Sequence, residues 1–321
     1  MPLILPPQRP SPAFPVLAQA TPMPDTLAGG VIAIGNFDGV HRGHQYVIEQ
    51  TVGLARRLGR KALVLTFEPH PRAFFQPDRP LFRLADGPTK IRLLAALGLD
   101  AVAIAGFDKA FAALSAEDFV TQVLVGWLKA AHVVIGQDFH YGAARAGNAQ
   151  SLIEAGIVHG FDVTRMTALC DGEATVSSTA IRDALMSGRI EDANALLGHA
   201  WFISTEVIHG DKRGRTLGYP TANLRLDPNS QLAHGIYAVK LGLDGIWHDA
   251  VASFGRRPTF DNGAPLLEVH VFDFSGDLYG REVDVAFAGY IREELKFDGL
   301  DALIAQMDED SGKARAILAR R

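Results

Sequence analysis

Short β-rich runs alternate with helical segments along residues 31–190, and this alternation restricts the fold more than any other feature of the sequence. The segments between the runs repeat apolar residues close to a period of 3.6. Such alternation predicts a doubly wound α/β fold, in which helices cover both faces of a parallel sheet. Strands are expected at residues 31–35, 61–67, 100–106, 132–136 and 161–166, and helical segments at 47–58, 89–98, 115–128 and 148–160.

The pattern changes beyond about residue 200, where β-rich runs follow one another with Gly, Asp and Pro between them. This pattern is typical of an antiparallel barrel or sandwich. Residues 300–318 return to a helical period, and we expect this helix to pack across the barrel. The sequence therefore predicts a Pro-rich disordered tail at 1–24, an α/β domain at 25–198 and a β domain at 199–321.

The tail contains eight of the 17 prolines within its first 24 residues, and Pro resists helix because it lacks a backbone donor. It lacks the basic start and unbroken apolar centre of a signal peptide. Cys170 is the sole cysteine, so no intramolecular disulfide can form and a reducing compartment fits. Apolar stretches fall short of the roughly 20 residues of a membrane span. We therefore expect a cytoplasmic protein.

The ten residues GNFDGVHRGH, Gly35 to His44, directly follow the first predicted strand, where ligands of parallel sheets bind. Their glycine spacing fits neither G-x-G-x-x-G nor GxxxxGK[ST]. Glycine nevertheless lets a ligand approach the backbone, and a helix that begins near Gly43 would offer free N–H groups to an anion. His41 and His44 are three residues apart and could face the same anion. The stretch therefore favours a phosphoryl-binding loop.

Two other interpretations of this stretch stay open from the residues alone. A pair of surface histidines beside a glycine turn would be ordinary, and a zinc site would need three or four ligands. A second element, VSSTAIRDAL at 176–185, places Ser178 or Thr179 to cap a helix that carries Arg182 in its first turn. Helix capping alone would explain Ser178 and Thr179, and solvent exposure alone would explain Arg182. Together, the three side chains could also stabilise the charge of a leaving pyrophosphate.

The motifs GNFDGVHRGH, TFEPHP, IGQDFHYGAARAG and SSTAIR, in this order, resemble the nucleotidyltransferase half of bacterial bifunctional riboflavin kinase/FMN adenylyltransferases, also called FAD synthetases. The second half resembles the kinase domain of that family through GDKRGRTLGYPTANL, GIYAV, RRPTF, EVHVFDFSGDLYG and IREELKF. The resemblance covers about residues 31–310. HxGH alone marks a wider superfamily, whereas PTAN with a downstream EVH is far more specific.

The resemblance implies that residues 25–198 transfer AMP from ATP to FMN, which gives FAD and pyrophosphate. Because the FMN phosphate itself attacks the α-phosphorus, the protein only positions the reactants and stabilises charge. Core packing is an equally open interpretation of Phe67. A solvated turn is an equally open interpretation of Asp138. The implied residues are His41 and His44 at the ATP phosphates, Ser178, Thr179 and Arg182 on the leaving side, Gly35, Asn36, Phe37, Asp38, Gly43 and Asp138 around the nucleotide, and Phe67, Pro69 and His70 toward the flavin.

The resemblance also implies that residues 199–321 phosphorylate riboflavin to FMN, with Mg²⁺ bridging the phosphates of ATP. Thr221 and Asn223 of PTAN match the family's metal and phosphate ligands. Glu268 of EVH matches the base that accepts the proton of the ribityl 5′-hydroxyl. By themselves, Thr221 and Asn223 would suit a barrel corner, and Glu268 would suit an outward-facing position on a strand. The match further assigns Lys212, Arg213 and Arg215 to a loop near the ATP phosphates and Arg292 to the flavin, where a solvated basic turn and a surface salt bridge are the alternatives.

Four positions depart from the family pattern without removing an assigned residue: Gln137, Tyr141, Val176 and Thr205. The expected partners are ATP, riboflavin and FMN, with FMN- and FAD-requiring proteins as recipients of the products. The net charge of −5 argues against a nucleic-acid coat, and no membrane partner is expected. An adenylyltransferase with another phosphorylated acceptor would leave PTAN and EVH unexplained. A flavin-sensing protein with silent sites would leave two complete motif sets unexplained.

Overall fold

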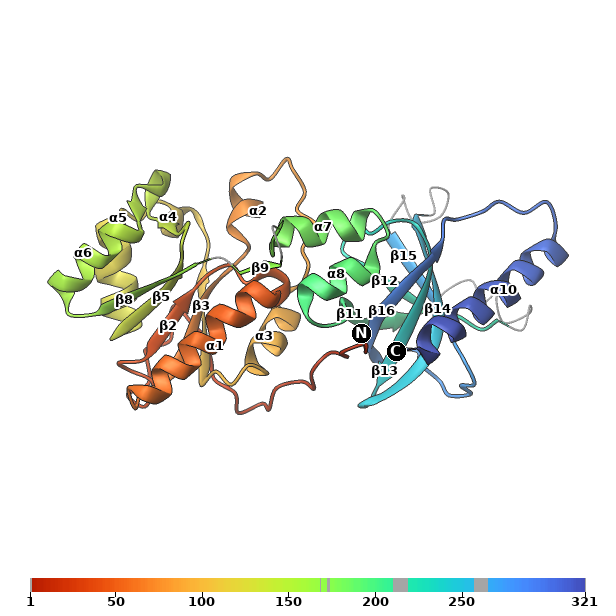
Figure 1. Ribbon diagram of the computed structural model, residues 1–321, viewed down its shortest axis with the longest axis horizontal. Coiled ribbons are helices and arrows are strands. Elements are labelled where there is room, and N and C mark those ends of the chain that lie inside the picture. Colours follow the sequence, from red (N-terminus) through yellow and green to blue (C-terminus); the bar gives the residue numbers. More distant parts are fainter. Residues whose placement is uncertain (1, 168, 172–173, 210–218, 257–264, 321) are drawn as a thin grey trace. The chain divides into compact units, whose positions relative to one another are not determined.

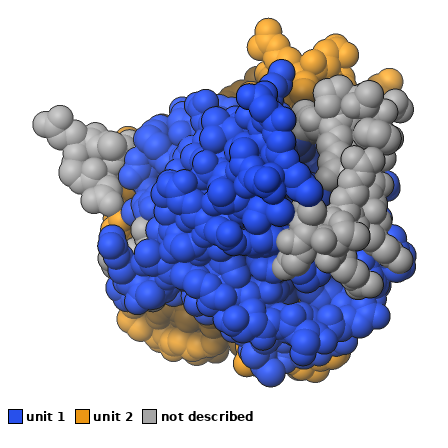
Figure 2. Space-filling model, turned by 90° about the vertical axis from the view of Figure 1, so that its right-hand side faces the viewer, with its two compact units in different colours: residues 1–6, 82–84, 178–321 blue, residues 7–81, 85–177 orange. Residues whose placement is uncertain are grey.

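The computed structural model describes residues 2–167, 169–171, 174–209, 219–256 and 265–320. The chain forms two compact units, which Figure 2 colours separately. The sheet unit comprises residues 7–81 and 85–177, and the barrel unit comprises residues 1–6, 82–84 and 178–321. The sequence placed a domain boundary after residue 198, whereas packing groups the segment from 178 to 198 with the barrel.

The sheet unit contains a six-stranded, all-parallel sheet with the strand order β1-β4-β3-β2-β5-β8, which confirms the predicted α/β fold (Figure 1). The strands are β1 (Val16–Ala18), β2 (Val31–Ile34), β3 (Ala62–Glu68), β4 (Ala101–Gly106), β5 (His132–Gly136) and β8 (Asp162–Met166). The helices are η1 (Asp38–Val40), α1 (Arg42–Arg57), α2 (Pro71–Phe75), α3 (Gly87–Ala95), α4 (Lys109–Ala112), α5 (Ala116–Asp118), η2 (Phe119–Trp127), η3 (Ala143–Arg145) and α6 (Ala149–His159). Two short hairpins are formed by β6 (His140–Tyr141) with β7 (Gly147–Asn148) and by β9 (Cys170–Asp171) with β10 (Ala174–Thr175).

The four central strands, β4, β3, β2 and β5, are buried on both faces, as their apolar runs predict. Alternate residues such as Ile32, Leu63 and Val133 join one hydrophobic cluster with the apolar residues of η2 and α6. Helix α1 packs against β2, β3 and β5 and buries Ile48. All strands of the sheet run in one direction, so the loops after β2, β3, β4 and β5 meet at the same edge.

The prediction of a disordered tail does not hold for the segment that contains β1. β1 extends the sheet as an edge strand, in parallel register with β4, and the Val102 N–H donates to the Pro15 carbonyl. Leu17 of β1 is buried in the core of the sheet unit. This burial helps to order a segment whose Pro content had suggested disorder. Proline is tolerated here because a strand on the edge of a sheet does not need every N–H group.

The barrel unit is a closed, six-stranded antiparallel barrel with the strand order β11-β12-β15-β14-β13-β16 (Figure 1). Its centre is filled by large aromatic side chains, among them Tyr237, Phe254 and Phe287. The terminal helix packs against β13, β14 and β16, as predicted. The elements are α7 (Ser178–Met186), α8 (Ile190–Leu197), β11 (Phe202–Ile208), β12 (Ala222–Arg225), β13 (Gly235–Leu243), β14 (Ile246–Arg256), β15 (Pro265–Val271), β16 (Glu282–Arg292) and α10 (Leu300–Ala319).

Helices α7 and α8 bury apolar residues in the same cluster as the barrel strands. Ile181 and Leu185 of α7 belong to this cluster together with Trp201. The indole N–H of Trp201 donates to the Leu84 carbonyl at 3.0 Å, so residues 82–84 join the same unit. Strand β12, within the PTANL stretch that sequence reasoning treated as a turn or corner, closes the barrel between β11 and β15.

Candidate active sites

The GNFDGVHRGH stretch forms the connection from β2 to α1 at the carboxyl edge of the sheet. Helix α1 begins at Arg42, one residue before the predicted start, and His41 is its N-cap. The His41 Nδ1 atom accepts a hydrogen bond from the His44 N–H at 3.3 Å. The two imidazole rings stack with centroids 3.6 Å apart, so the structure brings the predicted histidine pair together.

The environment of His44 disfavours a second positive charge. Burial, the neighbouring His41 imidazole and the ammonium of Lys90 hold the pKa of His44 well below its ordinary value of 6.5. Its Nδ1 atom is buried and has no hydrogen-bond partner among the residues that the structure describes. We conclude that His44 is a neutral imidazole at neutral pH.

The glycines of this connection have steric reasons that spacing alone did not reveal. A Cβ atom on Gly43 would lie 3.2 Å from the His41 ring, and one on Gly35 would lie 3.1 Å from the Phe37 ring. Gly39 has φ 77°, in the left-handed region where glycine is favoured. Gly43 and Gly35 therefore leave room for the His41 and Phe37 rings, and Gly39 lets the loop turn.

Phe37 and Asp38 hold this loop from the interior. Phe37 is 2% exposed, and its ring contacts the His44 ring edge-on at 5.2 Å. Asp38 is 3% exposed and accepts a hydrogen bond from the Ala85 N–H at 3.1 Å. Their burial suits residues that shape the nucleotide loop, and their predicted part in ATP binding stays a prediction.

A pocket of about 660 Å³ opens at the same edge of the sheet. Phe67, Phe107 and Phe111 form an aromatic wall, with ring centroids 5.5 to 5.9 Å apart. Arg72 and Arg145 add positive charge to the lining. The pocket brings together five of the predicted site residues, namely Gly35, Asn36, Phe67, His70 and Asp138, but it does not include Pro69.

The predicted second anion element lies in the barrel unit. Ser178 and Thr179 are inside the first turn of α7, and Ser177 stands at the preceding position, so neither is the N-cap that we expected. The helix begins earlier than its sequence suggested. The Arg182 Nε atom donates to the Phe82 carbonyl at 2.6 Å.

A row of side chains crosses five strands of the barrel through the register of its ladders. Asn223 of β12 pairs with Glu268 of β15, which pairs with Ser253 of β14. Ser253 pairs with Ile236 of β13, which pairs with Arg292 of β16. The alternate residues of these strands fill the core, so the row projects from the outer surface of the barrel.

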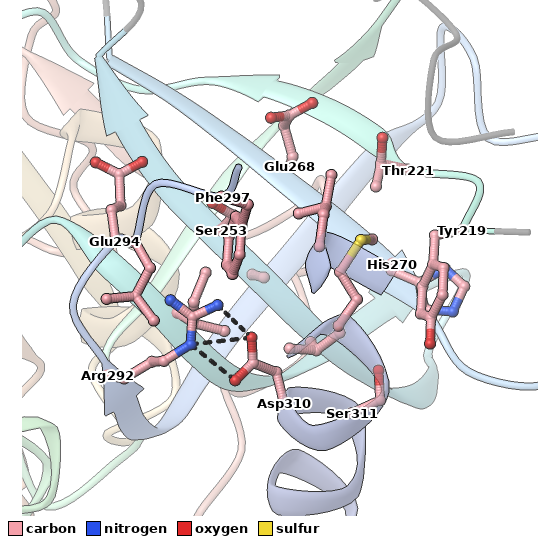
Figure 3. Close-up of a pocket in the computed structure, with 16 residues that line it drawn as sticks. Tyr219, Thr221, Ser253, Glu268, His270, Arg292, Glu294, Phe297, Asp310 and Ser311 are labelled. Atoms are coloured by element: carbon pink, nitrogen blue, oxygen red, sulfur yellow. Dashed lines mark hydrogen bonds and ion pairs between the residues drawn. The ribbon is translucent and has the colours of Figure 1, made fainter. Parts of the chain in front are cut away.

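The last four residues of this row line a pocket of about 340 Å³ between the barrel and α10 (Figure 3). Arg292 points toward Asp310 of α10, and its Nε atom donates to both carboxylate oxygens at 2.9 and 3.1 Å. Glu268 and Thr221 lie on the side of the pocket away from α10. Phe297, Leu303 and Met307 contribute apolar surface to this pocket.

Thr221 also lines a second hollow, of about 470 Å³, on the same barrel. His209 and Tyr279 stack there with ring centroids 4.1 Å apart. Asn223 is buried, and its amide Nδ2 donates to the Thr221 carbonyl at 3.4 Å. Thr221 therefore stands where two pockets meet, and Glu268 lines one of them.

Lys212, Arg213 and Arg215, predicted to form a phosphate-side loop, lie outside the described residues. Sequence reasoning also missed several residues that line the pockets or contact the residues that line them. Ser253 and Asp310 belong to no motif that we singled out, and Lys90 lies on a helix where an exposed lysine is the ordinary expectation. Arg145 stood within the quoted stretch GAARAG, which was its only signal.

In the described part of the chain, no helix is both long and apolar enough to cross a membrane. The same residues contain no group of three or more His, Cys, Asp or Glu side chains arranged to hold a metal ion.

An α/β unit with a basic and aromatic pocket, followed by a barrel with two adjoining pockets, defines a two-domain transferase class that handles phosphorylated ligands. The family model described as FAD synthetase matches residues 23–180, and the one described as riboflavin kinase matches residues 197–318. The chain belongs to the family of bifunctional riboflavin kinase/FMN adenylyltransferases, and it is a bifunctional enzyme, as the sequence resemblance predicted.

Curated relatives with that name match along most of their length. The Escherichia coli K12 protein is 42% identical over 288 residues, which cover 89% of this chain and 92% of the relative. The Listeria monocytogenes protein is 40% identical over 293 residues, which cover 90% and 93%. A crystal structure described as a macrolide-efflux protein from Streptococcus pneumoniae is similar with a TM-score of 0.84 and 31% identity, covering 94% of this chain and 98% of that one.

Proposed function

We propose that the two sites described above carry the two reactions of the family. At the barrel, the ribityl 5′-oxygen of riboflavin would bond to the γ-phosphorus of ATP as the bond to the β-phosphate breaks, which gives FMN and ADP. At the sheet, a phosphate oxygen of FMN would bond to the α-phosphorus of ATP, which gives FAD and pyrophosphate. The observation that carries the proposal is the position of Thr221 between two pockets, with Glu268 and Asn223 opposite each other in the ladder.

In the barrel unit, the pocket beside α10 suits riboflavin, because flat apolar and aromatic side chains surround it and Glu268 lies at one side. The adjoining hollow suits ATP, since the His209 and Tyr279 rings offer a stacking surface. A hydroxyl that reaches past Thr221 would approach the terminal phosphate. Glu268 would accept its proton as the new bond forms.

The residues at this junction fit Mg²⁺, which prefers oxygen ligands and is bound by few protein groups together with substrate phosphates. The Asn223 Nδ2 atom donates to the Thr221 carbonyl, so the amide oxygen is the atom that can face a cation. The Thr221 hydroxyl is a second oxygen. When bound, Mg²⁺ neutralises charge on the phosphates, and Thr221 and Asn223 would hold it there.

In the sheet unit, both histidines can present an N–H group from Nε2. His41 accepts through Nδ1, so its neutral ring carries the proton on Nε2. The same tautomer of His44 avoids a buried donor without a partner at Nδ1. The two donors and the N-terminus of α1 would stabilise the ATP phosphates as charge moves to pyrophosphate.

The aromatic pocket suits the flavin ring of FMN, and Arg72 and Arg145 suit its phosphate. His70, whose Nδ1 atom accepts from the Arg72 N–H at 3.1 Å, would help to fix that side of the pocket. The roles of Asp138, Pro69, Ser178, Thr179 and Arg182 stay predictions. We also propose that the products pass to FMN- and FAD-requiring proteins.

A product assay tests the proposal. Purified protein is incubated with riboflavin, ATP and Mg²⁺, or with FMN in place of riboflavin, and the flavins are separated by mass. We expect FMN and FAD from riboflavin, FAD and pyrophosphate from FMN, and no FMN formation from riboflavin after chelation of the metal. Protein that binds FMN but never releases pyrophosphate from ATP would instead be a flavin-binding protein. Pantetheine phosphate and nicotinamide mononucleotide, offered in place of FMN, test the other acceptors.

A further inference from the structure

Lys90 of α3 is a lysine in the interior of the sheet unit, with a side chain that is 2% exposed. Its Nζ atom lies 2.7 Å from the Glu68 Oε1 atom. It also donates to the Phe67 carbonyl at 3.2 Å and lies 3.5 Å from the Asn36 carbonyl. These partners lie at the carboxyl ends of β2 and β3, where the aromatic pocket opens.

A buried ammonium group is costly unless it is paired and hydrogen-bonded, and lysines are almost never fully buried otherwise. A place on the solvated surface, the ordinary explanation of a lysine, does not apply to Lys90, so its burial needs another reason. Its partners suggest one, because two of the three are main-chain carbonyls of residues that line the pocket. A lysine in this position fixes backbone, while the carboxylate of Glu68 balances its charge.

The backbone that Lys90 contacts leads directly into a strained loop. Phe37 and Val40 have φ values of 49° and 43°, in the left-handed region that side chains other than Gly rarely adopt. Such residues cost on the order of 1–3 kcal/mol each and persist where the surroundings hold them. His41, the N-cap of α1, directly follows the strained Val40.

The loop is held at two points by the segment that contains α3. The main-chain carbonyl of Asn36, the residue before Phe37, faces the Lys90 ammonium. It also accepts a hydrogen bond from the Thr66 hydroxyl at 3.1 Å. Within the strained loop, Asp38 accepts from the Ala85 N–H, just before α3 begins. The Lys90 ammonium and the Asp38 carboxylate are both buried, so solvent cannot readily replace either contact.

We infer that Lys90 is a positioning residue for adenylyl transfer, which holds the loop Asn36–Val40 so that His41 and His44 face the phosphates of ATP. The inference rests on the proposed role of the two histidines. Lys90 would act through the loop and would not itself contact the substrate. Its effect should then appear in the rate of the chemical step, since small displacements of catalytic groups lower that step strongly.

The test is Lys90→Met, which keeps the length of the side chain and removes the ammonium. We expect kcat for FAD formation from FMN to fall about 100-fold, the loss typical of a displacement near 1 Å. Riboflavin phosphorylation by the same chain should be unchanged, which shows that the barrel unit is folded, and the thermal midpoint reports on the sheet unit. The matched control is Lys61→Met, because Lys61 is ion-paired with Asp100 at the opposite end of β3 and is 50% exposed. Unchanged kcat in Lys90→Met, with only a lower thermal midpoint, would show a purely structural role and overturn the inference.

A double-mutant cycle decides whether Lys90 acts through the histidines. In the His41→Ala, His44→Ala background, Lys90→Met should lower kcat little further, because the groups that it positions are gone. A further loss as large as in the wild-type background would mean that Lys90 acts independently, and the inference would be wrong. If the histidine variant itself keeps full FAD formation, the proposed function of the histidines fails first. If that variant is inactive while Lys90→Met is fully active, only the present inference fails.

Discussion

Asn223 of β12 lies directly opposite Glu268 of β15 in the antiparallel ladder of the barrel. Such cross-strand neighbours have Cβ atoms roughly 5 Å apart, so an amide and a carboxylate share one face beside Thr221. The arrangement places the oxygen atoms that suit Mg²⁺ next to the carboxylate that suits a hydroxyl proton. The proposed metal binding and proton transfer of the kinase reaction would therefore depend on one strand pairing.

Glu268→Gln should abolish FMN formation from riboflavin while FAD formation from supplied FMN continues. General-base catalysis contributes about 10²–10⁴-fold, so kcat for the kinase reaction should fall by that range. Chromatography of the flavins from each reaction measures both activities. Glu206→Gln, an exposed glutamate on β11 that lines neither barrel pocket, is the matched control and should leave both activities unchanged. Loss of both activities in folded Glu268→Gln would contradict the assignment.

His41→Ala combined with His44→Ala should have the opposite effect, so that riboflavin is converted to FMN and FMN accumulates. Removal of one donor that stabilises developing charge costs about 10²–10³-fold in kcat. Because His41 also caps α1, His41→Asn is the informative single variant, since Asn is a good N-cap without an imidazole. We expect His41→Asn to keep the stability of the wild type and still lose FAD formation. Full activity of His41→Asn would show that only the cap matters.

The stability of the sheet unit should decrease when the pH falls below about 6.5. His44 has a folded-state pKa below its ordinary value of 6.5, so between these two values the unfolded chain binds more protons. The free energy of unfolding is therefore highest above 6.5 and falls as the pH approaches the lowered pKa. His132, whose pKa is also lowered, mainly by burial, acts in the same direction.

Urea unfolding at pH 5 and pH 7, followed by protection of the β2 and β3 amides against deuterium labelling, measures this dependence. His44→Asn should reduce the difference between the two pH values, because one of the histidines that must gain a proton is removed. His159→Asn is the control, since His159 lies at the exposed end of α6, beside Glu117. An identical pH dependence in wild type and His44→Asn would refute the explanation.

Asp310→Asn should weaken riboflavin binding and destabilise the barrel unit. The buried pair of Arg292 and Asp310 joins β16 to α10, and both residues line the pocket. Breaking a buried pair leaves an uncompensated charge and costs on the order of 3 kcal/mol. Asp273→Asn, which breaks the exposed pair between Asp273 and Arg315 of α10, should change stability far less. The KM for riboflavin and the thermal midpoint of each variant are compared, and equal effects of the two variants would contradict the prediction.

Local patterns predicted five of the six strands of the sheet and five of the six strands of the barrel, and missed β1 and β12. The alternation of β2, α1 and β3 depends on side chains a few positions apart, which the sequence shows directly. The motifs then located the loop before α1 and the PTAN and EVH strands. His41 and His44 could be predicted to act together because they are three residues apart at a helix start.

Only the tertiary structure decided which distant residues meet. The row from Asn223 to Arg292 depends on the register of four strand pairings. The β13–β14 turn helps to set one of them, but the pairings of strands distant in the chain depend on which faces are buried in the barrel. Burial decided that Asp38 supports the loop and that Lys90 binds carbonyl groups, although both residue types are ordinarily exposed. Burial is a property of the assembled layers, because it requires several elements to exclude water from the same side chain.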